Sequence, residues 1–73
     1  ALTEKEATIL KLLYWAFPND VIKDELLAEV WGFQNGVSTH TLATHIYRLR
    51  KKISRLTKKQ LVLTVEKGYR LAD

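Results

Sequence analysis

The sequence predicts one small domain over residues 1–73, mainly α-helical, with three helices followed by a β-hairpin. Three observations support this fold class. Residues 38–56 place apolar side chains at the alternating spacing of four and three that a helix docked on a core requires. Two shorter helical stretches with start and stop signals come before it, and a β-branched run with a tight turn follows it. Seventy-three residues are near the lower limit for a single unaided core.

The first helix is expected over residues 3–17. Thr3 can cap it, Glu6 three residues later completes a capping box, and Pro18 ends it. Apolar residues occupy more of its circumference than one core contact needs. One apolar face is Ala7, Leu10, Leu13, Tyr14 and Phe17, and a second is Ile9, Leu12 and Ala16, with Trp15 apart from both.

A turn signal at Asn19-Asp20 leads to Val21-Ile22, which fits either a very short strand or the apolar lead-in to a helix. The second helix is expected over residues 23–31, with acidic residues in its first turn and Gly32 after its end.

The third helix is expected over residues 39–56, capped by Ser38 or Thr39. Its apolar seam is Leu42, Ile46, Leu49, Ile53 and Leu56. The opposite side of the helical wheel carries His40, Thr44, Tyr47 and Lys51, flanked by Thr41, Arg48, Ser54 and Arg55.

The chain ends in a hairpin over residues 61–71. Residues 61–65 form one strand, Glu66-Lys67-Gly68 the turn, and Tyr69 begins the return strand. Lys58-Lys59, in the connector before it, is expected to be a solvated turn.

The charge is unevenly placed. Residues 1–32 hold three bases and six acids, a net charge of −3, whereas residues 33–73 hold nine bases and two acids, a net charge of +7. This asymmetry favours a polyanionic partner for the second half.

Several classes of protein are disfavoured. The chain has no Cys and only two His, so a metal site is not expected. It has no apolar run long enough to span a membrane, no Gly-rich phosphate loop, no Cys nucleophile and no carboxylate pair set against a His, so we expect a cytoplasmic non-enzyme without a cofactor.

Two helices, a third with a basic outer face, and a hairpin form the pattern of a winged helix-turn-helix. In that arrangement the third helix enters the major groove of double-stranded DNA and the hairpin, or wing, lies beside it. Thr, His and Tyr side chains offer hydrogen bonds or methyl contacts to base edges, and Arg and Lys offer charge to phosphates.

Four motifs carry a resemblance to the OmpR/PhoB-type winged-helix effector domain of bacterial response regulators. They are Leu2-Thr3-x-x-Glu6 with its following leucines, Leu26-Leu27-x-x-Val30-Trp31-Gly32, His45-Ile46-x-Arg48-Leu49-Arg50-Lys51-Lys52-Ile53, and Thr64-Val65 with Gly68-Tyr69-Arg70-Leu71. The resemblance implies a transcription factor that binds promoter DNA, often as a tandem homodimer on direct repeats. It also implies that loop 32–37 corresponds to a loop that touches RNA polymerase in some members.

The resemblance and the helical wheel together give a set of candidate DNA-binding residues. They are His40, Thr41, Thr44, His45, Tyr47, Arg48, Arg50, Lys51, Arg55 and, in the wing, Lys67. The chain departs from the family in three places: the wing turn is one residue short, His40 stands where Arg is frequent, and Ile22 stands where a Ser or Thr cap is usual. The family's preceding sheet and its receiver domain are absent from these residues, so Ile9, Leu12 and Trp15 are candidates for an exposed docking surface.

Some of these residues also fit structural roles. His45 flanks the seam, and Arg50 lies near enough to the core side to pair with Glu25 or Glu29. Trp31 and Tyr69 are expected in the core. Two alternatives to DNA binding remain: a protein-interaction module that docks through the apolar first helix, and RNA binding, for which the chain lacks aromatic platforms.

Overall fold

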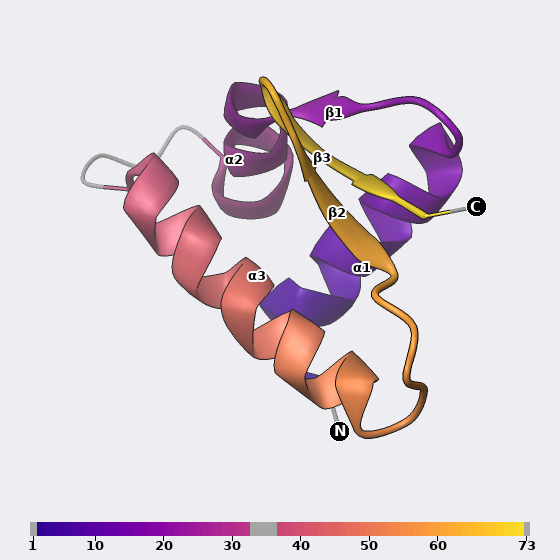
Figure 1. The fold of residues 1–73 in the computed structure, drawn as a ribbon. Coiled ribbons are helices and arrows are strands. Elements are labelled where there is room, and N and C mark those ends of the chain that lie inside the picture. The colour runs from indigo at the N-terminus through magenta and orange to yellow at the C-terminus, as the bar shows by residue number, and fades with distance from the viewer. Residues whose placement is uncertain (1, 33–36, 73) are drawn as a thin grey trace.

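A computed structural model describes residues 2–32 and 37–72 and shows three helices with a small antiparallel sheet, the arrangement of a winged helix-turn-helix (Figure 1). The elements are α1 (Glu4–Ala16), β1 (Val21–Ile22), α2 (Lys23–Trp31), α3 (Thr39–Ser54), β2 (Val62–Val65) and β3 (Gly68–Leu71). The bounds of α1, α2 and the hairpin agree with the expected ones to within one residue. No helix in the described ranges is both long and apolar enough to cross a membrane.

The predicted capping box begins α1. The Thr3 hydroxyl accepts a hydrogen bond from the Glu6 backbone N–H at 3.2 Å, and the Glu6 carboxylate accepts one from the Thr3 backbone N–H at 2.9 Å. Two N–H groups that an α-helix leaves unpaired at its start are therefore satisfied. The helix ends at Ala16, before Pro18, as the position of the proline predicts.

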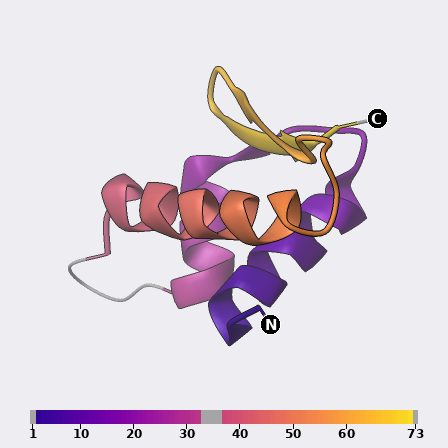
Figure 2. The ribbon, with the colours of Figure 1, turned by 60° about the horizontal axis from the view of Figure 1, so that its bottom comes forward.

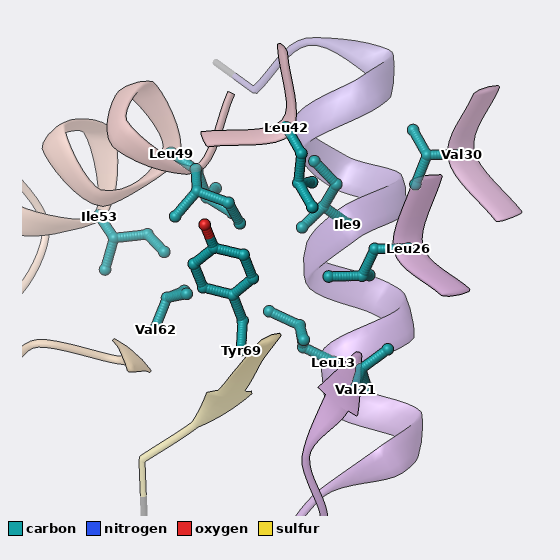
Figure 3. Packing of buried hydrophobic residues seen from close by; sticks show 11 residues of the cluster. Ile9, Leu13, Val21, Leu26, Val30, Leu42, Leu49, Ile53, Val62 and Tyr69 are labelled. Carbon is teal, nitrogen blue, oxygen red and sulfur yellow. The ribbon is translucent and has the colours of Figure 1, made fainter. Parts of the chain in front are cut away.

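The core lies where the three helices and the sheet meet. Figure 3 shows Ile9 and Leu13 of α1 facing Leu49 and Ile53 of α3, with Tyr69 from the hairpin between them. The remaining core members are Val21, Leu26, Val30, Leu42, Ile46 and Val62. Trp31 packs against this cluster while half-buried, and Tyr69 lies within it, so the expected core positions of both residues are confirmed.

The expected assignment of faces on α1 was partly wrong. Ile9, a candidate for an exposed surface, is fully buried, whereas Tyr14 and Phe17 of the expected core face are exposed. Ala7 is exposed as well. Trp15 is 69% exposed, as the docking hypothesis required of it, and Leu12 is half-buried. The side of α1 that carries Glu6, Ile9 and Leu13 faces the protein because α2, α3 and β3 all pack there.

The third helix is shorter than its sequence pattern indicates. It ends at Ser54, and Leu56, the fifth residue of the expected seam, lies beyond it and is 89% exposed. The apolar spacing thus continues past the end of the helix without a core to face. At the other end Ser38 occupies the cap position, but its hydroxyl makes no capping hydrogen bond.

The sheet has the strand order β1-β3-β2, with both pairs antiparallel. Val21-Ile22 is therefore a short strand that pairs with Gly68 and Tyr69, which decides between the two interpretations of that dipeptide. A Cβ atom at Gly68 would lie 1.9 Å from the carbonyl oxygen of Val21, so only glycine permits this close approach. The Lys23 backbone N–H also donates to the Lys67 carbonyl at 3.1 Å, which ties the wing turn to the start of α2.

Candidate nucleic-acid interface

The α3 helix lies along one side of the molecule, with the hairpin next to it and α1 and α2 on its other side (Figure 2). Leu42, Ile46 and Leu49 are at most 1% exposed, and Ile53 is 8% exposed. These four positions hold one stripe of the helix in the core, so the polar stripe opposite must face outward.

A second contact fixes α3 at its C-terminal end. The Lys52 ammonium donates to the Glu6 carboxylate at 2.7 Å, and the Glu6 side chain is only 1% exposed. This hydrogen bond from Lys52 lowers the pKa of the Glu6 carboxyl below its ordinary value, and it outweighs burial, which raises that pKa. The first turn of α1 is therefore joined to the last turns of α3 by a charged pair.

The outward stripe of α3 carries hydroxyl, aromatic and guanidinium groups. Tyr47 is 57% exposed, Arg48 is exposed, and Thr41 and Thr44 are half-buried. The Thr44 hydroxyl donates to the His40 carbonyl at 3.1 Å, one turn earlier. That bond holds the Thr44 hydroxyl against the preceding turn of the helix.

The basic side chains predicted to bind DNA differ in the contacts that they make within the protein. Within the part of the chain that the structure describes, the Arg48 and Arg55 side chains have no hydrogen-bond or ion-pair partner. The Lys51 ammonium lies 5.0 Å from the centre of the Tyr47 ring, an arrangement that favours a cation–π contact. Lys67 is exposed in the wing turn and borders a hollow that Thr39 of α3 also lines. Positive charge is thus available along α3 and on the wing.

His45 is half-buried between α2 and α3. Its Nδ1 lies 2.9 Å from the Thr41 carbonyl oxygen, and its ring meets the Trp31 ring edge-on with centroids 5.0 Å apart. A carbonyl oxygen only accepts, so Nδ1 donates and only Nε2 remains for a ligand. Both the structural role and the contact role expected of His45 are compatible with this geometry.

The Arg50 side chain forms hydrogen bonds with the hairpin. Its Nε donates to the Val62 carbonyl at 3.0 Å and its Nη2 to the Thr64 hydroxyl at 2.6 Å. The guanidinium also lies 5.8 Å from the centre of the Tyr69 ring. Its partners are therefore in β2 and β3 and not the acids of α2, so it joins α3 to the wing.

The two lysines of the connector after α3 are exposed, as the expected solvated turn requires. Lys58 and Lys59 line a hollow together with Tyr47 and Lys51. The only sequence signal for that hollow was the position of two lysines directly after a basic helix. The loop at 32–37, expected to match a polymerase-contacting loop, lies mostly outside the described residues. Residues 2–32 and 37–72, which the structure describes, contain no group of three or more His, Cys, Asp or Glu placed to hold a metal ion.

Comparisons with known proteins agree with the fold. The chain is 32% identical to the heme response regulator HssR of Staphylococcus epidermidis over 71 residues, which are 96% of the chain and 32% of that protein. It thus spans about a third of the length of this curated relative.

Solved structures match over most of the chain. The C-terminal domain of the nisin resistance regulator NsrR is 32% identical, with a TM-score of 0.79 over 96% of this chain and 71% of that one. The DNA-binding domain of the response regulator AdeR, in complex with an intercistronic region, has a TM-score of 0.87 at 24% identity and covers 100% of this chain and 74% of that one.

Residues 1–71 match the family described as transcriptional regulatory protein, C terminal, whose members are regulators and not enzymes. With the capping box, the three helices, the wing and the basic outer stripe of α3 in place, this chain belongs to that family, the OmpR/PhoB-type winged-helix DNA-binding domains of response regulators.

Proposed function

We propose that this domain binds double-stranded DNA sequence-specifically, with α3 in the major groove and the wing beside it. The observation that carries the proposal is the division of α3 into two stripes. Leu42, Ile46 and Leu49 are buried, while Tyr47 and Arg48 are exposed on the other side. A major groove accepts a single helix and displays a distinct hydrogen-bonding pattern for each base pair.

The side chains divide into two proposed roles. Thr41 and His45 lie on the margins of the stripe and Thr44 in its middle; all three are half-buried and suit base edges, and the threonines also suit thymine methyl groups. The longer or charged residues suit phosphates, and Arg48 also suits guanine. This second group is His40, Tyr47, Arg48, Lys51, Arg55 and Lys67. Arg50 is proposed to act through the hairpin that it holds, because its guanidinium is already bonded there.

Selection of binding sequences from a random duplex library tests the proposal, and the recovered sites show whether two direct half-sites, as a tandem homodimer requires, are preferred. Arg48→Ala should weaken binding to all sequences, while Thr44→Ala should change base preference at one position by about 1–3 kcal/mol. Lys11→Ala is the matched control, because Lys11 is an exposed base on α1 about 200° around the helix from the buried Ile9. Equal affinity of the Arg48 and Lys11 variants would contradict the assignment of α3.

One observation favours a second candidate function, docking of a protein on α1. Tyr14 and Trp15 are 68% and 69% exposed, which is unusual for adjacent large aromatic residues. The dependence of binding on salt concentration distinguishes the two candidate functions. DNA binding through about six phosphates should fall with a slope near −5 in a plot of log affinity against log salt concentration, whereas apolar docking should change little.

A further inference from the structure

A hollow lies at the C-terminal end of α3, next to the proposed DNA-binding stripe. It has a volume of about 350 Å³. One wall is the polar stripe of α3, where Tyr47, Lys51 and Ser54 follow one another at spacings of four and three. The opposite wall is the connector 58–60, and the floor is apolar, formed by Ile53, Leu61 and Val62.

The charged residues that line this hollow are all basic. Lys51, Lys58 and Lys59 are exposed on its walls, and no carboxylate is among the described residues that line it. Arg50 also borders it, but its guanidinium is bonded to β2. Three ammonium groups around a concave surface attract an anion. Because lysine binds phosphate as a point charge from many directions, the three do not require one fixed ligand geometry.

The walls are held in place by bonds within the protein. Arg50 ties α3 to Val62, which forms part of the floor. At the connector, the Thr57 backbone N–H donates to the Ile53 carbonyl at 3.0 Å, and the Lys59 backbone N–H donates to the Thr57 hydroxyl at 3.3 Å. Binding therefore does not have to order the backbone that carries Lys59, which reduces its entropic cost.

The length of α3 determines what reaches this hollow. Sixteen residues at 1.5 Å each give a helix about 24 Å long, about twice the 12 Å width of the major groove. If the first turns of α3 lie in the groove, its last turns meet the sugar-phosphate backbone at the rim. The half-buried Leu61 can contact the deoxyribose, while the lysines reach the phosphate.

From these observations we propose that the hollow formed by Lys51, Lys58 and Lys59 seats a backbone phosphate of the bound DNA at the rim of the major groove. This inference rests on the proposed function, since it assumes that α3 carries the DNA. It assigns Lys58 and Lys59, for which the sequence predicts only a solvated turn, to the binding surface. The partner group is a phosphodiester of the duplex, and free phosphate would share its chemistry.

The test is the salt dependence of binding to a duplex selected from the random library, measured for Lys58→Gln, Lys59→Gln and the double variant. Loss of the one phosphate that these lysines seat should reduce the log–log slope by about 0.9. Between 50 and 200 mM salt the wild type should therefore lose about 3.5-fold more affinity than the double variant. Lys11→Gln removes the same charge from the far side of α1 and should keep the wild-type slope. All four variants alter exposed side chains and should retain the wild-type thermal midpoint.

Two results overturn the inference. The first is that the double variant shows the same slope of log affinity against log salt concentration as the wild type and Lys11→Gln. The second is a double variant that loses affinity for inorganic phosphate in a calorimetric titration while its DNA slope is unchanged, because the hollow would then hold free anions only. A wild-type chain that fails to bind duplex DNA would instead refute the proposed function itself.

Discussion

Replacing Glu6 with Gln should destabilise the domain without changing its shape. Both hydrogen bonds to the side chain, from the Thr3 N–H and the Lys52 ammonium, end on Oε1, which Gln retains. The substitution removes the charge and replaces Oε2 by an amide NH₂ group. A hydrogen bond to a charged group contributes about 1.5–3 kcal/mol and a neutral one about 0.5–1.5 kcal/mol. Because Lys52 is 34% exposed and partly screened, we expect the free energy of unfolding to fall by about 1–2 kcal/mol at pH 7.

The effect should depend on pH in a defined direction. The pKa of Glu6 is lowered in the folded protein, so the carboxylate contributes its stabilisation above the ordinary value of 4.5. That contribution disappears as the pH falls through the lowered folded pKa. The wild type and Glu6→Gln should therefore differ at pH 7 and converge as the pH falls through the lowered pKa of Glu6.

Thermal unfolding followed by circular dichroism measures both expectations. In a domain of this size each kcal/mol moves the midpoint by about 4–8 °C. Glu4→Gln is the matched control: it removes the same charge from the same first turn, but Glu4 is exposed. Equal midpoints for the two variants at pH 7, or an unchanged gap between wild type and Glu6→Gln at low pH, would refute the reasoning.

Three further substitutions test other contacts by the same unfolding assay. Gly68→Ala should cost at least about 1–3 kcal/mol, since its Cβ would overlap the Val21 carbonyl, and an unchanged midpoint would show that β1 moves aside freely. Arg50→Gln should cost about 1–3 kcal/mol without any DNA present; full stability with impaired DNA binding would instead make Arg50 a contact residue. Thr3→Ala should cost about 1 kcal/mol by removing the cap, and a decrease below a few tenths would contradict that role.

Local signals in the sequence were sufficient for the start of α1, the limits of α2 and the position of the wing. The capping box spans Thr3 and Glu6, and Gly32 follows α2 directly, so each can be identified from neighbouring residues. The inward stripe of α3 was equally clear, because its apolar residues form one line opposite a polar one.

Contacts between distant segments could not be predicted in the same way. Apolar residues surround α1 on most sides, so only its neighbours in the fold show that Ile9 faces inward and Tyr14 outward. Glu6 and Lys52 are 46 residues apart, and Arg50 finds its acceptor 12 residues later. Leu56 continues the helical spacing, yet spacing carries no information about where the core ends.

The close approach of Gly68 to Val21, with the bond from Lys23 to the Lys67 carbonyl, has a mechanical consequence for DNA recognition. These contacts tie the wing to β1 and to the start of α2, and so restrain its height above α3 before any duplex binds. In the proposed complex, adaptation between wing and DNA would then come from the Lys67 side chain or from the duplex itself. We therefore expect the sequence preference at the base pairs under the wing to depend on how easily these base pairs change the groove width, even where no side chain touches a base.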